Sequence, residues 1–306
     1  MFKKYSSIEN HYNEKFINMF LEMYPELKDE TYTITEKIHG ANISFLFEPD
    51  TETRIASRSG ITDTGFYGIN NVINNYKNVF EILQKYVDGN KETITSLNIF
   101  GEFFGANIQK GVDYGKEKRI LFFDMAINEQ YISQYEFLTL MNDLNLTQYL
   151  VPIIDIVDGL DNALNIFTKF DSKLSKNENN IAEGIVIKPY NNVYTNGHDI
   201  FYIKKKNDSF LEKQKSSHIK EPMNENISTI NKCFLEYITD NRLNSVFSKH
   251  DIIKDKKDIG KYIALFINDA KEDFLKEYDV TLYSDKELKA IFNVGKKPFE
   301  LLSKYL

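Results

Sequence analysis

The sequence predicts an α+β domain built around β-sheets, followed by a small all-helical domain. From about residue 31 to 206, short runs rich in β-branched and aromatic residues recur, and only a few helical patterns interrupt them. From about residue 226 onward, apolar residues instead recur at helical spacing. Because the strands come in clusters and do not alternate strictly with helices, the first domain is assigned to the α+β class.

Each predicted element of the first domain corresponds to a short stretch of sequence. The expected strands are TYTITEK (31–37), ANISFLF (41–47), TRIAS (53–57), LNIFGEFFG (97–105), RILFFDMAI (119–127), LVPIIDIV (150–157), EGIVIKP (183–189) and IFYIKKK (200–206). The expected helices cover residues 10–23, 68–86, 134–145 and 158–168. The polar stretch at about 213–226, which contains Pro222, is the predicted linker, so the domains are predicted to span 1–225 and 226–306.

Composition restricts the compartment and the chemistry. The single cysteine, Cys233, cannot form an internal disulfide, and no apolar run is long enough to be a signal peptide core or to cross a bilayer. These features predict a cytoplasmic protein with no membrane association. The five histidines show no paired spacing typical of metal ligands, and there is no CxxC motif, so a structural zinc site is not expected.

The charge distribution gives conflicting indications about nucleic acid. The net charge of −7 argues against such a partner, because phosphate contacts are made by lysine and arginine. Residues 203–220, however, contain six lysines and only two acidic residues, a local net charge of +4. On composition alone, a solvated protein face explains this segment at least as well as a binding surface does.

A Lys-x-x-Gly tetrad occurs twice, and its context distinguishes the two copies. Lys257 to Gly260 stands at the charged start of a helical pattern, which is typical of a solvated surface. Lys37 to Gly40 stands between two strands, in a turn where a side chain can point into a cleft. A lysine there can act as a nucleophile if burial or nearby positive charge favours its neutral form. Strand alternation places Lys204 and Lys206 on one face, where they could supply that charge and hold a phosphate.

Further motifs carry little information singly, and their order along the chain carries more. The order is EKIHG, SRSG, FGEFFG, LFFD, EGIVIKP and YIKKKN. It resembles the ordered motifs of the covalent nucleotidyltransferases, which include DNA ligases, RNA ligases and mRNA capping enzymes. The stretches MFKKYSSIENHYNEKF, GEFFGANIQKGVDYG, NGHDIFYIKKKNDSFLEKQK and NRLNSVFSK are most similar to the double-stranded RNA ligases, the family of RNA ligase 2 of T-even phages. The resemblance runs from residue 1 to at least 249.

This resemblance implies a fold, a reaction and a set of partners. The fold would be an antiparallel-sheet nucleotidyltransferase domain followed by a helical domain that grips RNA. The reaction would be ATP-dependent sealing of nicks in duplex RNA: AMP is attached to a lysine, passed to a 5′-phosphate, and released when the 3′-OH attacks. ATP and Mg²⁺, with Mn²⁺ as an alternative ion, would be the required cofactors. Independently of the resemblance, a monomer is the default expectation. If the protein is phage-encoded, the cytoplasm predicted above would be that of the host.

The resemblance also implies residue roles. Lys37 would be the nucleophile. Lys204 and Lys206 would grip the α-phosphate, and His39 would either reach the outgoing pyrophosphate or position the adenylate. The residues expected around the nucleotide are Glu36, Ile38, Arg58, Glu102, Phe123 and Lys188, with Phe123 stacking on the adenine, Glu102 accepting a ribose hydroxyl and Lys188 gripping the α-phosphate. Glu183 would hold the metal ion. In the helical domain, Arg242 and Lys249 would contact the RNA backbone.

Two alternatives remain compatible with the sequence. The first is a DNA ligase or capping enzyme, although these usually add a β-barrel domain and the C-terminal region here is predicted to be helical. The second is a non-catalytic nucleotide- or RNA-binding protein, although every motif residue needed for the chemistry is present.

Overall fold

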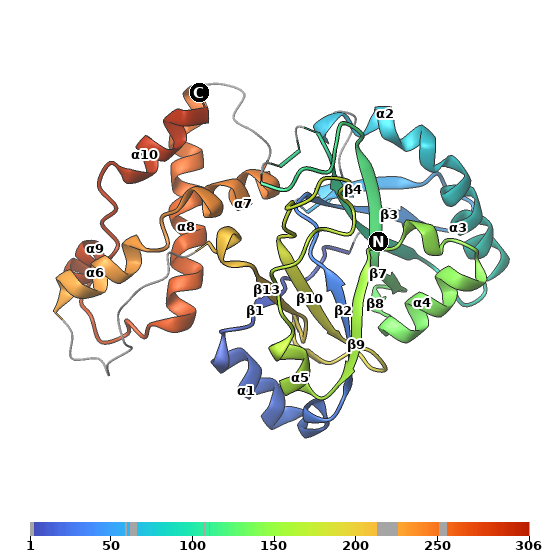
Figure 1. Ribbon diagram of the computed structural model, residues 1–306, viewed down its shortest axis with the longest axis horizontal. Helices are drawn as coiled ribbons and strands as arrows, with labels where there is room; N and C mark the ends of the chain where they lie inside the picture. Colours follow the sequence, from blue (N-terminus) through green and yellow to red (C-terminus); the bar gives the residue numbers. More distant parts are fainter. Residues whose placement is uncertain are drawn as a thin grey trace. The chain divides into compact units, whose positions relative to one another are not determined.

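The computed structural model describes residues 3–58, 60–61, 66–106, 108–109, 111–212, 226–250 and 256–305. It divides into two compact units, residues 1–207 and 208–306 (Figure 1). Residues 208–212 thus group with the helical unit. Almost all of the predicted linker, residues 213–225, lies outside the described residues, as do three lysines of the basic segment. The linker therefore stays a prediction.

The first unit contains a five-stranded sheet in the order β1-β13-β10-β2-β9. These strands are β1 (Glu9–Asn10), β13 (Ile203–Lys206), β10 (Gly184–Pro189), β2 (Thr31–Glu36) and β9 (Ile153–Asp158). Only the β1–β13 pair is parallel among the strands described in this sheet. Tyr32 and Ile34 of β2 point into an apolar core that α1 (Glu14–Met23) and α5 (Leu160–Asn165) help to form. Because side chains alternate along a strand, the intervening residues of β2 and β10 point to the face of the sheet that is turned away from this core.

The second sheet of this unit has six strands in the order β5-β4-β3-β6-β7-β8, all antiparallel. These strands are β5 (Gly60–Ile61), β4 (Arg54–Ser57), β3 (Ala41–Phe47), β6 (Leu97–Phe104), β7 (Arg119–Ile127) and β8 (Gln130–Tyr131). The helices α2 (Asn70–Ile73), α3 (Lys77–Gly89) and α4 (Gln134–Asp143) lie to one side of it (Figure 1). A large apolar core joins α3 and α4 to this sheet. A short hairpin of β11 (Thr195–Asn196) and β12 (Asp199–Ile200) completes the unit.

The second unit is helical in its described residues. Its helices are α6 (Ile227–Leu235), α7 (Asp240–His250), α8 (Ile259–Glu277), α9 (Asp285–Ile291) and α10 (Lys297–Leu302). The apolar positions that recur at helical spacing in the sequence form one core, in which Phe234, Phe266 and Phe274 are fully buried. The apolar pattern of α6 and α8 is therefore satisfied inside this unit.

Most differences from the predicted elements lie at their ends. The N-terminal helix begins at Glu14 because the Asn13 side chain accepts a hydrogen bond from the Phe16 N–H at 3.2 Å and caps it. The helix expected at 158–168 covers only α5, which starts directly after Gly159. None of the helices in the described ranges is both long and apolar enough to span a bilayer.

Candidate active site

Lys37 lies immediately after β2, in the turn that leads into β3. Its backbone N–H donates to the Gly184 carbonyl at 2.9 Å, which ties the start of the turn to β10. The turn is closed by Gly40, where an added Cβ would lie 2.4 Å from the Phe103 carbonyl oxygen of β6. Only glycine lets β6 approach the turn this closely. The glycine of Lys-x-x-Gly therefore fixes the position of the Lys37 turn relative to β6.

The Lys37 ammonium is paired with the carboxylate of Glu183, with 2.8 Å between Nζ and Oε2. The other oxygen of that carboxylate lies 2.9 Å from Lys206 Nζ. Gly184, the next residue after Glu183, is paired with Lys206 across β10 and β13. It has a φ of +151°, and a Cβ there would lie 2.2 Å from the Lys205 carbonyl oxygen. A glycine is therefore required for the strand pairing that brings Glu183 and Lys206 together.

Glu183 is an ionised carboxylate in a poorly solvated position. Its side chain is 3% exposed, against 10% for Lys206 and 19% for Lys37. Burial acts to raise the pKa of Glu183, but the positive charges of Lys206 and Lys37, with a contribution from His39, outweigh it and lower the pKa to about 2. The carboxylate of Glu183 thus holds the ammonium groups of Lys37 and Lys206 side by side. Two such cations close together attract phosphate.

Glu102 is a second carboxyl group in the same neighbourhood. It lies on β6 and is partly buried. Burial raises the pKa of Glu102 to about 7, an effect opposed by Lys37 and increased by Glu183. The charge of Arg58 also acts on Glu102, and its guanidinium donates to the Ser7 hydroxyl at 3.0 Å. Glu102 and Arg58 therefore lie in one neighbourhood, and their predicted contacts with the nucleotide stay a prediction.

Phe123 lies beside the fully buried ion pair of Lys188 and Asp124. The Lys188 Nζ is 3.1 Å from the Asp124 carboxylate, donates to the Phe123 carbonyl at 2.7 Å, and lies 5.1 Å from the centre of the Phe123 ring. Tyr5 donates to Asp124 at 3.0 Å and packs edge-on against Phe123. This corrects the predicted grip of Lys188 on the α-phosphate: the residue is 2% exposed, and its ammonium is committed to Asp124 and to the backbone that carries Phe123.

The residues on either side of Lys37 are held by other loops. The buried carboxylate of Glu36 accepts hydrogen bonds from the Ser172 hydroxyl at 2.5 Å and from the backbone N–H of Lys173 at 2.8 Å. Burial raises the pKa of Glu36, and these hydrogen bonds oppose that shift. Ile38 is buried at 4% exposure, and the backbone N–H of His39 donates to the Tyr114 hydroxyl at 2.9 Å.

The lysines of β13 alternate between its two faces, as predicted. Lys205 points away from the Glu183 carboxylate and donates to the carbonyls of Leu164 and Ile166 at 2.7 and 2.9 Å. Lys206 reaches Glu183 from the other face of the strand. Lys204, two residues earlier, lies on the face of Lys206 and is half-buried.

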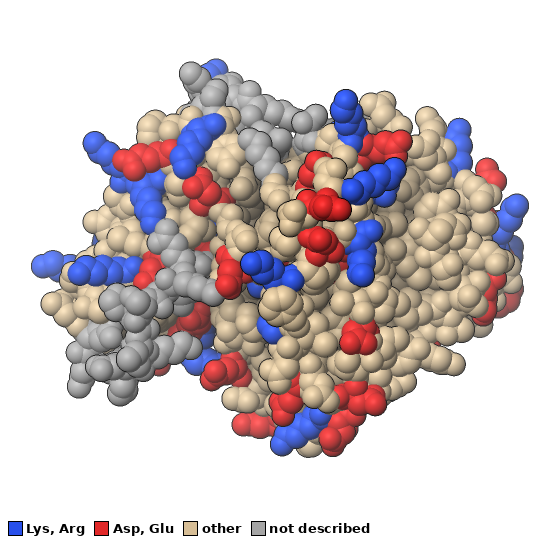
Figure 2. Space-filling model, viewed as in Figure 1, with Lys and Arg blue, Asp and Glu red and all other residues tan. Residues whose placement is uncertain are grey.

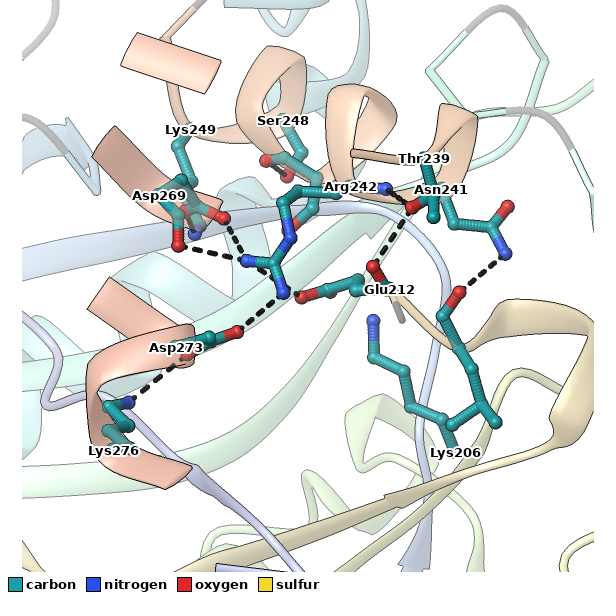
Figure 3. A network of polar contacts seen from close by, with 12 residues as sticks. Lys206, Glu212, Thr239, Asn241, Arg242, Ser248, Lys249, Asp269, Asp273 and Lys276 are labelled. Atoms are coloured by element: carbon teal, nitrogen blue, oxygen red, sulfur yellow. Dashed lines mark hydrogen bonds and ion pairs between the residues drawn. The ribbon is translucent and has the colours of Figure 1, made fainter. Parts of the chain in front are cut away.

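Arg242 does not lie where the sequence interpretation placed it. It is on α7 with 1% exposure, and its guanidinium lies 2.6 Å from the Asp269 carboxylate and 2.8 Å from that of Asp273, as Figure 3 shows. Burial acts to lower the pKa of Arg242, but the carboxylates of Glu212, Asp273 and Asp269 raise it above the usual value. The prediction that Arg242 contacts RNA backbone is therefore wrong, because its charge is buried and neutralised within the helical unit.

Lys249 joins the same network from the end of α7. Its ammonium is paired with Asp269, and its side chain is 30% exposed (Figure 3). Lys276 similarly pairs with Asp273 at 3.3 Å. Because Lys249 keeps part of its side chain at the surface, the RNA contact predicted for it stays a prediction.

A divalent cation such as Mg²⁺ needs several oxygen ligands. Among the residues that the structure describes, no group of three or more His, Cys, Asp or Glu side chains could hold a metal ion. Glu183 nevertheless offers an ionised carboxylate, the oxygen ligand that Mg²⁺ prefers. Mg²⁺ is commonly bound by one or two carboxylates together with substrate phosphates and water, so this site fits a metal that arrives with a nucleotide.

Two family models match the chain. A model described as RNA ligase matches residues 30–219, and a model described as T4 RNA ligase 2 C-terminal matches residues 217–297. The first match contains Lys37, Glu183 and Lys206, and the second contains most of the helical unit.

Solved structures of a Naegleria gruberi RNA ligase share the fold. A mutant form with AMP and Mn has a TM-score of 0.52 at 19% sequence identity, and the match covers 69% of this chain and 57% of that chain. A structure with PPi has a TM-score of 0.51 at 20% identity with the same coverage. The match therefore spans little more than half of the Naegleria protein. The predicted class, an antiparallel-sheet nucleotidyltransferase domain followed by helices, is confirmed by this fold and by the match to the C-terminal model.

Sequence reasoning missed three residues around this site. Tyr5 stands in the N-terminal segment before any predicted element, and Tyr114 and Ser172 stand in loops. Each makes its contact with a residue more than 70 positions away in the chain. The only sequence signal was the resemblance of the stretches that contain Tyr5 and Tyr114, which did not reveal what these side chains touch.

Proposed function

The chain belongs to the RNA ligase family, and we propose that it is an ATP-dependent RNA ligase that seals breaks between a 3′-OH and a 5′-phosphate in duplex RNA. The observation that carries the proposal is the arrangement of Lys37 and Lys206 on the buried, ionised carboxylate of Glu183. Such a site combines a lysine nucleophile with a second fixed positive charge for phosphate. Phe123 and Glu102 supply an aromatic face for adenine and an acceptor for a ribose hydroxyl.

The reaction proceeds in three transfers. Lys37 Nζ attacks the α-phosphorus of ATP, so that a P–N bond forms, the bond to pyrophosphate breaks and the lysine loses its proton. The AMP then moves to the 5′-phosphate of RNA, which frees Lys37. Finally the 3′-OH attacks that phosphate, and AMP leaves as the strands are joined. Each step depends mainly on positioning and on stabilising charge on phosphate oxygens.

The ion pair of Lys37 with Glu183 has a consequence for the first transfer. A lysine attacks with a free nitrogen lone pair, whereas Lys37 Nζ donates a hydrogen bond to the Glu183 carboxylate at 2.8 Å. Nucleotide binding must therefore draw Glu183 away from Lys37, while Lys206 turns to the phosphate. Mg²⁺ or Mn²⁺, when bound by Glu183 and the phosphates, neutralises negative charge on the nucleotide.

RNA binding is proposed for the helical domain, residues 226–306, together with the basic segment that precedes it. On the face drawn in Figure 2, acidic and basic side chains are interspersed. Attraction for RNA must then come from local groups such as Lys249, since the net charge of the chain is −7. Duplex RNA would be recognised by its A-form shape and its 2′-hydroxyl groups, and binding should weaken as salt rises.

One experiment tests the proposal against its alternatives. The protein is incubated with Mg²⁺ and either α-labelled ATP or α-labelled GTP, and is then offered nicked duplexes whose 3′-OH strand is RNA or DNA. We expect covalent label from ATP and sealing where the 3′-OH end is RNA. Label from GTP would indicate a capping enzyme, equal sealing of DNA ends would indicate a DNA ligase, and absence of label would indicate a binding protein.

Oligomeric state and compartment complete the proposal. We propose a monomer, because the apolar cores described above are each closed within one unit. The single cysteine, Cys233, is a buried free thiol, which fits a reducing compartment such as the cytoplasm.

A further inference from the structure

Two loops far apart in the sequence are hydrogen-bonded to each other near the Lys37 turn. They are residues 111–118, between β6 and β7, and residues 171–181, before Glu183, and together they are named the clasp. The Asp113 N–H donates to Asn180 Oδ1 at 2.9 Å, and the Asp113 carbonyl accepts from Asn180 Nδ2 at 2.7 Å. The Asp113 carboxylate also accepts from Asn177 Nδ2 at 2.8 Å. These reciprocal bonds join the loops directly.

The clasp contacts the chain on both sides of Lys37. From the second loop, Ser172 Oγ donates to the Glu36 carboxylate at 2.5 Å, and the backbone N–H of Lys173 donates to the same carboxylate at 2.8 Å. From the first loop, the Tyr114 hydroxyl accepts the backbone N–H of His39 at 2.9 Å. The residue before the nucleophile and the residue two positions after it are therefore both attached to the clasp.

The interior of the clasp links these two attachment points. The Tyr114 ring, 8% exposed, packs edge-on against Phe104 with 4.9 Å between ring centres. The Arg119 guanidinium lies 5.1 Å from the centre of the Phe104 ring and donates to the Leu174 carbonyl at 3.1 Å. The Leu174 N–H in turn donates to Ser172 Oγ at 3.2 Å, so that this hydroxyl both donates and accepts. A continuous set of packed and hydrogen-bonded groups thus runs from Tyr114 to Ser172.

We propose that the clasp positions the nucleophile: Tyr114 holds the backbone N–H of His39 and Ser172 holds the side chain of Glu36, so that Nζ of Lys37 is held in line with the α-phosphorus of ATP. The inference rests on the proposed function. Lysine carries its amine on a long flexible stem, so once Glu183 has been drawn away, the position of Nζ depends on where the Lys37 backbone is held. A shift of about 1 Å in a reacting group can cost about 100-fold in rate. Tyr114 and Ser172 are positioning residues, because neither needs to touch ATP for this effect.

This role makes a prediction that differs between the steps of the reaction. Attachment of AMP to Lys37 and its transfer to RNA depend on the position of Nζ. Sealing of an RNA strand that already carries AMP on its 5′-phosphate does not use the lysine amine. Loss of a clasp contact should therefore slow the first transfer and leave the last one unchanged, whereas a general loss of structure would slow both.

The test is Tyr114→Phe, which removes the hydroxyl and keeps the ring. Lysyl-AMP formation is followed with α-labelled ATP and Mg²⁺, and sealing is followed separately on nicked duplex RNA with a pre-adenylylated 5′ end. We expect the rate constant at saturating ATP to fall about five- to tenfold, the effect of one lost hydrogen bond on a barrier, with KM for ATP unchanged. Sealing of the pre-adenylylated strand should remain that of the wild type, and the melting temperature should fall by no more than about 4 °C, the effect of one lost hydrogen bond in a unit of this size.

Ser172→Ala is the second variant, and the same selective loss is expected. Tyr135→Phe is the matched control, because Tyr135 is 53% exposed and lies outside the clasp. Label formation at the wild-type rate in both clasp variants, or equal losses in the two assays, would overturn the positioning role. A wild-type protein that takes no label would instead refute the proposed function, and the clasp proposal with it.

Discussion

Replacement of Arg242 by alanine tests the buried ion network of the helical unit. The change would leave the carboxylates of Asp269 and Asp273, which are 15% and 17% exposed, without the cation that joins them. Breaking a buried ion pair by removing one partner costs about 3–5 kcal/mol. Lys249 and Lys276 still pair with these carboxylates, so we expect the lower end, about 3 kcal/mol.

The assay is thermal unfolding of the full chain followed by calorimetry, with lysyl-AMP formation as a separate readout of the first unit. A loss of about 3 kcal/mol should lower the melting temperature of a unit of this size by about 12 °C or more. Arg54→Ala is the matched control, since its ion pair with Glu48 is 41% and 27% exposed and should contribute less than about 1 kcal/mol. A melting temperature for Arg242→Ala within the range of that control would refute the assignment of Arg242 to a structural role.

Three further predictions concern the active site. Glu183→Gln should slow lysyl-AMP formation by about 100-fold or more in a rapid-quench assay, because the anion that pairs with Lys37 and is proposed to bind the metal is lost; near-normal labelling would contradict this. Gly40→Ala should abolish labelling and lower the melting temperature, since the new Cβ would lie 2.4 Å from a backbone oxygen, whereas Gly260→Ala, with nothing within 4 Å, should be neutral or slightly stabilising. Burial raises the pKa of Glu102 to about 7 in the folded protein, against about 4.3 in the unfolded chain. The protonated side chain therefore stabilises the fold fully at pH values below about 4.3, and this stabilisation is lost as pH rises through about 7. Relative to Glu102→Gln, the wild type should lose on the order of 3 kcal/mol between pH 4.5 and 8 in chemical denaturation, and a difference that does not change with pH would exclude this.

The sheets could be predicted closely because their local pattern agrees with their environment. The strands at 41–47 and 119–127 have the predicted bounds, since their residues alternate between a large apolar core and the opposite face. Proline and glycine account for two differences. The strand expected from 150 begins at Ile153, directly after Pro152, which has no N–H for a ladder, and α5 begins only after Gly159.

The polar contacts of the site could be predicted only in part. Motif order brought Lys37, Glu183 and Lys206 to one place, and the structure joins them through direct ion pairs. The ion pair of Lys188 with the buried carboxylate of Asp124 could not be predicted from the strand sequence. Strand alternation predicts which face a side chain lies on, but it does not identify the side chain's partner. Long-range hydrogen bonds to loops, such as that between Tyr114 and the Lys37 turn, have no periodic signal at all.

Arg242 illustrates a local pattern that gave the wrong environment. An arginine in a polar helix such as α7 is ordinarily solvated, and the predicted RNA contact assumed this. The informative signal lay on α8, where Asp269 and Asp273 are spaced by four residues next to the buried Ala270 and Phe274. Two carboxylates beside an apolar stripe require a cation from a neighbouring helix, and only the tertiary structure identifies which one supplies it.

The site of AMP attachment tests the central claim most directly. The protein is incubated with ATP and Mg²⁺, digested, and its peptides are analysed by mass spectrometry. We expect one AMP adduct, linked through a phosphoramide bond to the Nζ of Lys37, and no adduct in Lys37→Ala. Attachment to another residue, or an adduct that persists in Lys37→Ala, would contradict the assignment of Lys37 as the nucleophile.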